Sequence, residues 1–205
     1  REYVLNVCTK TVEVHTRISD LFRSPMDQVK EQLTVAVEKI KEKQEDELIN
    51  NGSYGLLNNV HDSMRVKPRG GAPTPDDMDE LLARVWKEPS FFLAHPRTIA
   101  AFGRECTRRG VPPPTVTLFG TPMITWRGVP LVPSDKLHIS GKKSDILPGI
   151  PCAVSPSLSI RFMGISQKGA AGYLFSLYCS AAALVDDAIG VLEGVEVDRY
   201  HDYGP

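Results

Sequence analysis

The chain has 205 residues, a formal net charge of −1, 41% hydrophobic residues and 24% charged residues. This length allows one ordinary domain or two small ones with a substantial core. The absence of a basic excess argues against a protein that binds nucleic acid through its overall charge, and no apolar run is long enough to span a membrane.

A strand region followed by a long helix opens the chain. Apolar residues alternate over residues 3–18, which predicts one or two strands. The clearest helix runs from Ser24 to Asn50, with Ser24 as N-cap, Pro25 at the first helical position and Asp27 as the capping acid. An Asn-Asn-Gly sequence ends it. The exposed face mixes both charge signs, so we interpret it as solvated rather than as a binding surface.

A second helix follows the loop at residues 51–74. Thr74, Pro75 and Asp77 repeat the capping pattern of the first helix, and Pro89 is expected to end the second one. Its predicted apolar stripe consists of Met78, Leu81, Leu82, Val85 and Trp86. The helix dipole favours acids in the first turn, so these acids require no chemical role. A Gly-Gly pair at residues 70 and 71 precedes the helix. No Lys-Ser or Lys-Thr follows that pair, and a phosphate-binding loop is therefore not supported.

A short strand and a third helix complete this unit. The sequence FFLAH predicts a buried strand, and Pro96 opens a helix that ends at Gly110. We expect three inward residues, Ile99, Ala100 and Phe102, and three outward residues, Arg104, Arg108 and Arg109. Cations are favoured at a helix C-terminus in any case.

The rest of the chain is rich in strand-forming residues, proline and glycine. Hairpin turns are predicted near Gly120-Thr121 and Arg127-Gly128. The segment LSIRFMGI predicts a strand, residues 173–183 fit a strand or a helix, and AIGVLEGVEVDRY predicts a final strand. The fold class is therefore α+β.

Catalytic and metal-binding motifs are not recognisable in the sequence. The cysteines, Cys8, Cys106, Cys152 and Cys179, match no zinc or redox spacing, which predicts reduced thiols. The five histidines have no ligand spacing either. Two acid pairs, Asp76-Asp77 and Asp186-Asp187, have no evident partners for acid–base chemistry. We therefore predict no enzyme, no cofactor and no metal, although an enzyme with scattered site residues would have a similar sequence.

Several collinear motifs carry a resemblance to a known family. FFLAHPRTIAAFGRECTRRGVPPP, TWRGVPLVPSDK, GAPTPDDMDELL and DDAIGVLEGVEVDRYH resemble the family 2 encapsulin shell proteins of the 2A type. That group includes cyanobacterial sulfur-regulated shell proteins and the mycobacterial major membrane protein I. The resemblance covers nearly the whole chain.

The resemblance implies the Hong Kong 97 phage-capsid fold. Residues 1–55 would form a peripheral domain with the end of an extended loop and the spine helix, residues 24–50. Residues 56–157 would be mainly the axial domain, and residues 158–205 would be returning strands and a C-terminal tail. The N-terminal arm and most of the extended loop would be absent from this sequence.

The same resemblance implies a function. Many copies would close into an icosahedral T=1 shell in the cytoplasm around a cargo enzyme, usually a pyridoxal-phosphate cysteine desulfurase of sulfur metabolism or storage. The alternatives are a 2B-type shell with terpenoid-enzyme cargo, a phage major capsid protein, and a soluble enzyme.

One segment departs from the family pattern. A strand and loop are expected to be missing around Ser144–Leu147, either because residues are absent there or because an insertion belongs there. An insertion would favour the 2B type, which carries a cyclic-nucleotide-binding domain, whereas VPPPTVTLFG favours the 2A type.

The resemblance also predicts a pore rim. The loop Arg109–Thr115 would approach the five-fold pore, and the rim residues would be Arg108, Arg109, Pro112, Pro113 and Pro114. A shell subunit should also expose apolar residues and strand edges that its neighbours cover. We expect such surfaces on the strand at 3–14 and at Tyr200 and Tyr203.

Overall fold

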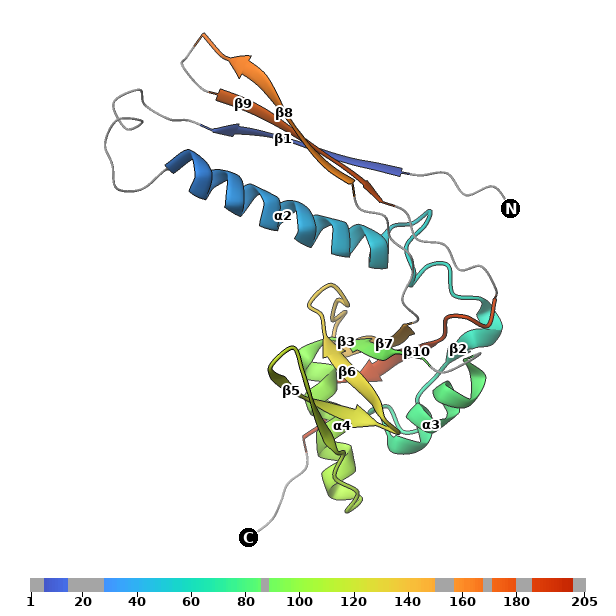
Figure 1. The fold of residues 1–205 in the computed structure, drawn as a ribbon. Helices are drawn as coiled ribbons and strands as arrows, with labels where there is room; N and C mark the ends of the chain where they lie inside the picture. Colours follow the sequence, from blue (N-terminus) through green and yellow to red (C-terminus); the bar gives the residue numbers. More distant parts are fainter. Residues whose placement is uncertain are drawn as a thin grey trace. The chain divides into compact units, whose positions relative to one another are not determined.

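The computed structural model describes residues 6–14, 28–85, 89–149, 157–167, 171–179 and 186–200. The chain divides into two compact units (Figure 1). Unit 1 comprises residues 1–48 and 153–181, and unit 2 comprises residues 49–152 and 182–205. Helices and strands occur in both units, as expected for an α+β chain.

Unit 1 contains an antiparallel sheet in the order β1-β9-β8. Its strands are β1 (Asn6–Val14), β8 (Ser157–Ile165) and β9 (Ala171–Cys179). The predicted strands near the start of the chain and at LSIRFMGI are confirmed. The segment that fitted either a strand or a helix is a strand up to Cys179, and it pairs with both neighbours along its length.

The long helix α2 (Gln28–Asn50) packs one face against this sheet. Ala36 and Ile40 are buried together with Phe175 of β9. The helix ends at Asn50, as predicted, because the Asn51 side chain accepts hydrogen bonds from the next backbone amides (Ser53 N, 2.8 Å). The predicted cap at residues 24–27 lies outside the described residues.

Unit 2 is built on a seven-stranded mixed sheet in the order β2-β10-β7-β3-β6-β5-β4. The strands are β2 (Arg65–Val66), β3 (Phe91–Ala94), β4 (Thr115–Leu118), β5 (Thr121–Trp126), β6 (Val129–Pro133), β7 (Lys143–Gly149) and β10 (Val191–Glu196). The helices are η1 (Asp62–Met64), α3 (Pro75–Arg84) and α4 (Pro96–Arg108).

The absence of a strand and loop around Ser144–Leu147, relative to the family pattern, stays a prediction. These residues lie inside β7, which is continuous and pairs antiparallel with β10 on one side and with β3 on the other. Ile146 and Leu147 are fully buried because β7 is a central strand.

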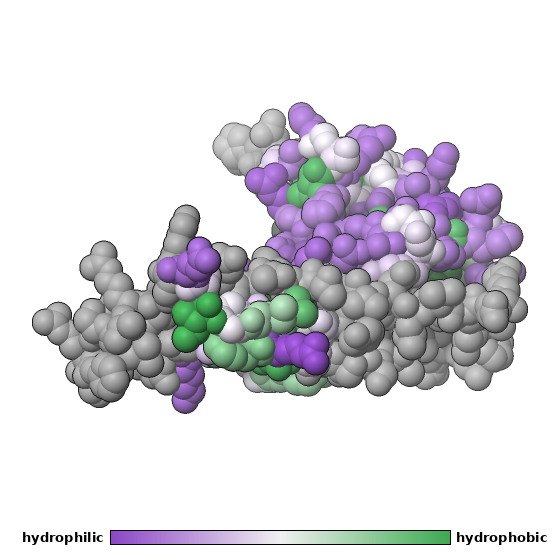
Figure 2. All heavy atoms as spheres, turned by 90° about the horizontal axis from the view of Figure 1, so that it is seen from above, coloured by the Kyte–Doolittle hydropathy of each residue, from purple (hydrophilic) through white to green (hydrophobic). Residues whose placement is uncertain are grey.

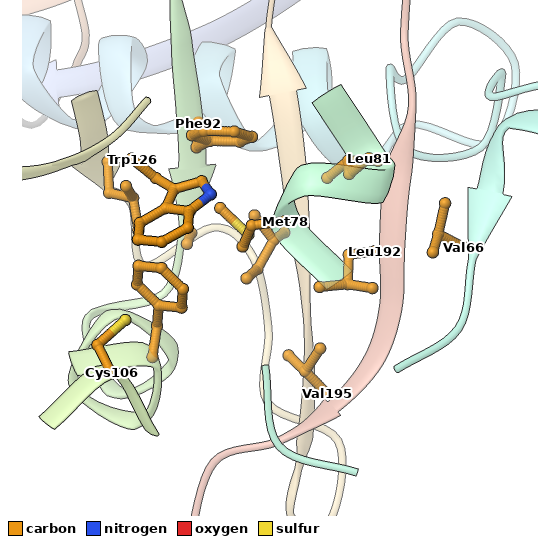
Figure 3. Close-up of a cluster of buried hydrophobic side chains, with 12 residues drawn as sticks. Val66, Met78, Leu81, Phe92, Cys106, Trp126, Leu192 and Val195 are labelled. Carbon is orange, nitrogen blue, oxygen red and sulfur yellow. The ribbon is translucent and has the colours of Figure 1, made fainter. Parts of the chain in front are cut away.

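The main core of unit 2 lies between its sheet and its helices α3 and α4 (Figure 3). Met78 and Leu81 of α3 and Phe102 of α4 point into it, together with Phe92 of the sheet. The rings of Phe102 and Trp126 meet edge to face, with centroids 5.6 Å apart and planes at 85°. This core fixes the positions of both helices.

The capping predictions for α3 are confirmed. The Thr74 side chain accepts from Asp77 N, and the Asp77 carboxylate accepts from Thr74 N (3.1 Å). The helix ends at Arg84, earlier than Pro89, because Val85 already has an extended backbone (φ −73°, ψ 127°). Trp86 lies outside the described residues.

The predicted start of α4 at Pro96 is confirmed, but two of its facing assignments are wrong. Ala100 is exposed, whereas Ala101 is buried beside Phe102, because the buried face follows a 3.6-residue period. Arg104 is not an outward residue either, since it is partly buried and donates to Val197 O at 2.7 Å.

Both predicted hairpins are present. The β4–β5 turn has Phe119 (φ 51°) and Gly120 (φ 79°) at its centre, and the β5–β6 turn has Arg127 (φ 51°) and Gly128 (φ 86°). Two consecutive positive φ values are typical of type I′ turns, whose twist matches that of the flanking strands. A bulky residue at the first position is strained there.

Candidate pore-rim segment and shell-forming surfaces

The predicted rim residues lie together on one segment of unit 2, where α4 ends. Gly110 has φ +69° and donates to Thr107 O at 3.0 Å, while Val111 N donates to Cys106 O at 3.0 Å. This pair of bonds is a Schellman motif, which a glycine at this position favours. The motif fixes the direction in which the chain leaves the helix.

Three prolines connect this helix end to β4. Pro112 and Pro114 are exposed, and Pro113 is partly buried. The Pro114 carbonyl accepts hydrogen bonds from the Thr125 backbone N (2.7 Å) and the Thr125 hydroxyl (3.2 Å). Because each proline ring fixes φ, the segment keeps a defined course without extensive packing.

The two predicted rim arginines are engaged in ion pairs. Arg108 donates to the Glu105 carboxylate from Nη2 (2.9 Å) and Nε (3.2 Å). Arg109 donates to Asp76 Oδ2 at 3.1 Å, and its Nε lies 3.8 Å from Glu105 Oε2. The Glu105 side chain is only 4% exposed. Two acids therefore balance the two arginines.

Sequence reasoning missed Glu105 and Asp76 as parts of this segment. The spacing of Glu105 to Arg108 and Arg109 is i,i+3 and i,i+4, which places all three on one side of a helix and was visible in the sequence. The contact between Asp76 and Arg109 links α3 to α4 and depends on the tertiary fold.

The β4–β5 hairpin beyond this segment exposes apolar side chains. Phe119 at its tip is 98% exposed, and Val111 and Val116 are also exposed. Residues 110–124 include no charged side chain. A two-stranded hairpin is marginally stable without further packing, so this element is suited to gain support from another molecule.

The base of the hairpin is held firmly on α3. The Asp79 carboxylate accepts from Trp126 Nε1 (2.7 Å) and from Arg127 Nη2 (2.7 Å) and Nε (3.0 Å). The hydrogen bond from Arg127 lowers the pKa of Asp79, against the opposing effect of partial burial, and Trp126 lowers it further. Sequence reasoning did not identify this clamp, because Asp79 is 47 residues from Trp126.

Unit 1 exposes a second apolar surface along β8. Four of its side chains, Ile160, Phe162, Met163 and Ile165, are at least half exposed. Hydrophobic residues gather over the described part of this sheet (Figure 2). In register, Ile160 and Phe162 lie opposite Phe175 and Tyr173, which pack against α2. Ile160, Phe162 and Ile165 therefore lie on the face of the sheet against which α2 packs, whereas Met163, at the register shift of β8, lies beside Gly172 on the other face.

The predicted contact surfaces at the chain's two ends are only partly described. β1 pairs with β9 along one edge, and the described residues supply no strand at its other edge. Tyr200 is largely exposed and lies over the Arg104 guanidinium, 4.6 Å from the ring centroid. Tyr203 lies outside the described residues.

No reactive cluster is formed by the residues that the structure describes. Among them, no group of three or more His, Cys, Asp or Glu residues could hold a metal ion. Burial raises the pKa of the Cys106 thiol to about 11, so the thiolate nucleophile is scarce near neutral pH. None of the described helices is long and apolar enough to cross a membrane.

Comparisons with known proteins identify the family. The family model "Type 2A encapsulin shell protein SrpI-like" matches residues 1–199. The shell protein SrpI of Synechococcus elongatus is 57% identical over 219 aligned positions, which cover 99% of this chain and 72% of that protein. The chain belongs to the type 2A encapsulin shell proteins. A shell protein of this type from Mycolicibacterium paratuberculosis is 51% identical, with 99% and 71% coverage.

Solved structures agree with this membership. The cryoEM structure of the holo-SrpI encapsulin complex from Synechococcus elongatus matches with a TM-score of 0.91 and 56% identity, covering all of this encapsulin chain and 79% of that one. The aligned length to SrpI exceeds the 205 residues here, so SrpI has residues that this chain lacks. The 2A membership also decides between the two shell subfamilies considered from the sequence.

More distant structures show the fold. The capsid of an empty gene-transfer-agent (GTA) particle matches with a TM-score of 0.71 at 12% identity over 93% of this chain and 72% of that one. A virus-like particle from Pyrococcus furiosus matches with a TM-score of 0.52 at 13% identity over 92% and 77%. The encapsulin chain therefore has the phage-capsid fold of the Hong Kong 97 type, as the resemblance implied.

Proposed function

We propose that this encapsulin protein assembles, in many identical copies, into an icosahedral T=1 shell that encloses a cargo enzyme in the cytoplasm. The observation that carries the proposal is the match to the SrpI complex over the whole chain at 56% identity. At that identity, subunit surfaces as well as the fold are largely retained. The chain itself acts as a structural component and performs no catalysis.

Unit 1 and unit 2 take the peripheral and axial positions in this proposal. The exposed apolar residues of β8 and the uncharged β4–β5 hairpin support it, because a subunit that remained alone would leave both in water. When one patch of a copy contacts a different patch of its neighbour, the assembly is finite if the rotation between successive copies returns to the first copy. Each contact can be modest in area because every copy makes several of them.

The segment from Arg108 to Pro114 forms the pore rim in the proposed shell. Its supports are the Schellman motif and the prolines, which give it a fixed course, and its exposure in the isolated subunit. Solutes that the cargo needs would pass this rim. The arginines there are largely neutralised by Glu105 and Asp76, so the proposed preference for anions is weaker than the sequence alone predicts.

The cargo in this proposal is a pyridoxal-phosphate cysteine desulfurase, and the shell serves sulfur metabolism or storage. Membership in the 2A type supports this assignment over a terpenoid enzyme. Membership in an encapsulin family also separates the chain from phage capsid proteins, whose likeness at 11–12% identity concerns the fold alone.

Purification of the native particle from its host tests the proposal. We expect uniform icosahedral particles by electron microscopy and a copurifying desulfurase by mass spectrometry, with a pyridoxal-phosphate absorbance band. Particles that contain a different enzyme would overturn the cargo assignment. Particles that contain DNA would favour a capsid instead.

A further inference from the structure

Glu105 occupies an unusual position at the end of α4. Its side chain is 4% exposed, and its carboxylate lies within ion-pair distance of both Arg108 and Arg109. A buried carboxylate is costly unless it is paired, so this acid holds both guanidinium groups against the helix. Arg108 and Arg109 lie inside the Schellman motif, which joins Cys106 and Thr107 to Val111 and Gly110 and at which the rim segment leaves the helix.

Among the described residues, four charged groups form the ion pairs of this segment. Arg108 and Arg109 supply two positive charges, and Glu105 and Asp76 supply two negative ones. Residues 110–124 add none. These four charges balance, and removal of the Glu105 carboxylate leaves one uncompensated cation per subunit.

We propose that Glu105 is the specificity-determining residue of the rim, the group that keeps the pore nearly indifferent to the charge of small ions. The inference rests on the proposed function, because it requires the segment to line the five-fold pore. Glu105 acts through Arg108 and Arg109 and is thus a positioning and charge-balancing residue. Around a five-fold axis, each charge removed from one subunit is repeated five times.

The test uses shells of the full-length protein that are reassembled around a fluorescent dextran. Stopped-flow quenching measures the entry rates of iodide, thallium(I) and neutral acrylamide. In Glu105→Gln shells, we expect iodide entry to rise and thallium(I) entry to fall, each by about two- to threefold at physiological ionic strength. Acrylamide entry should stay unchanged, and the shift should shrink at 1 M salt.

Three further variants make the result specific. Arg108→Gln should lower the entry rate of iodide and raise that of thallium(I). The Glu105→Gln/Arg108→Gln double variant should restore the original ratio of the two rates. Glu80→Gln is the matched control, because Glu80 also bridges two arginines, but these are Arg69 and Arg84, neither of which belongs to the rim segment. It should leave the iodide-to-thallium ratio unchanged.

A labelled cysteine separates failure of this inference from failure of the pore position. Val111→Cys shells carrying a bulky maleimide should slow the entry of all three quenchers, relative to unmodified shells treated with the same reagent. Unchanged entry would show that the segment does not line the pore. Slowed entry together with an unchanged ion ratio in Glu105→Gln shells overturns the role of Glu105. If Glu105→Gln does not assemble, an unchanged ratio in Arg108→Gln overturns it.

Discussion

Ile165 offers a direct test of the exposed surface on β8. Its side chain is 72% exposed in the isolated subunit, so truncation removes little that stabilises the subunit itself. If neighbouring copies cover this residue in the shell, Ile165→Ala should weaken assembly rather than folding. The substitution deletes three carbon groups, and burial of each contributes about 0.8 kcal/mol.

The exposed fraction sets the size of the effect. Only the exposed 72% of Ile165 can become buried on assembly. Scaled by this fraction, the truncation should weaken the assembly by about 1.7 kcal/mol per subunit. Since about 1.4 kcal/mol corresponds to a tenfold change in an equilibrium constant, the critical subunit concentration should rise about 15-fold. Incomplete coverage by the neighbour would reduce this figure.

Light scattering of dissociated and reassembling full-length protein measures that concentration. Arg161→Ala is the control, because Arg161 lies on the same strand and is exposed, but its register partner Leu174 places it on the opposite face. We expect the control to stay within about twofold of the unmodified protein. A critical concentration for Ile165→Ala that is equally unchanged would show that β8 is not covered in the shell.

Three more predictions follow from individual contacts. Phe102→Ala should lower the free energy of unfolding by about 3–5 kcal/mol, measured by denaturant titration, because it empties a fully buried site against Trp126; a loss below about 1 kcal/mol would contradict the packing described. The hydrogen bond from Arg127 lowers the pKa of Asp79. The ion pair therefore stabilises the folded state above the pKa that the carboxyl group has in the unfolded chain, and this stabilisation is lost as the pH falls through the lower pKa of the folded state. Asp79→Asn should therefore cost about 1 kcal/mol or less at pH 7 and nothing in strong acid, and a cost that persists in acid would refute the ion pair. Cys106 in the folded subunit should react with a thiol reagent at pH 8 far more slowly than in denaturant, since burial raises its pKa to about 11; equal rates would show that it is accessible.

The fold could be predicted where local chemistry determined it. The capping box at Thr74 and Asp77, the start of α4 at Pro96 and the two type I′ turns all depend on residues within a few positions of one another. The strand assignment of residues 171–179 could not be settled in this way. It depends on pairing with β1 and β8, which are distant in sequence.

The charge balance of the candidate rim segment could be predicted only in part, and its place at a pore stays a prediction. The segment is contiguous in sequence, and the helix spacing would have indicated Glu105. The ion pair from Arg109 to Asp76 and the clamp from Asp79 to Arg127 join residues 33 and 48 positions apart. Such contacts follow from the packing of α3 against α4 and the sheet, which a single sequence does not reveal.

Self-assembly is the central claim, and one measurement tests it most directly. Analytical ultracentrifugation of the unmodified full-length protein at micromolar concentration, with electron microscopy of the same sample, reports the size and closure of what it forms. The account predicts one fast-sedimenting boundary and uniform closed particles. A single slow boundary at the mass of one chain, with no particles on the grid, would contradict it.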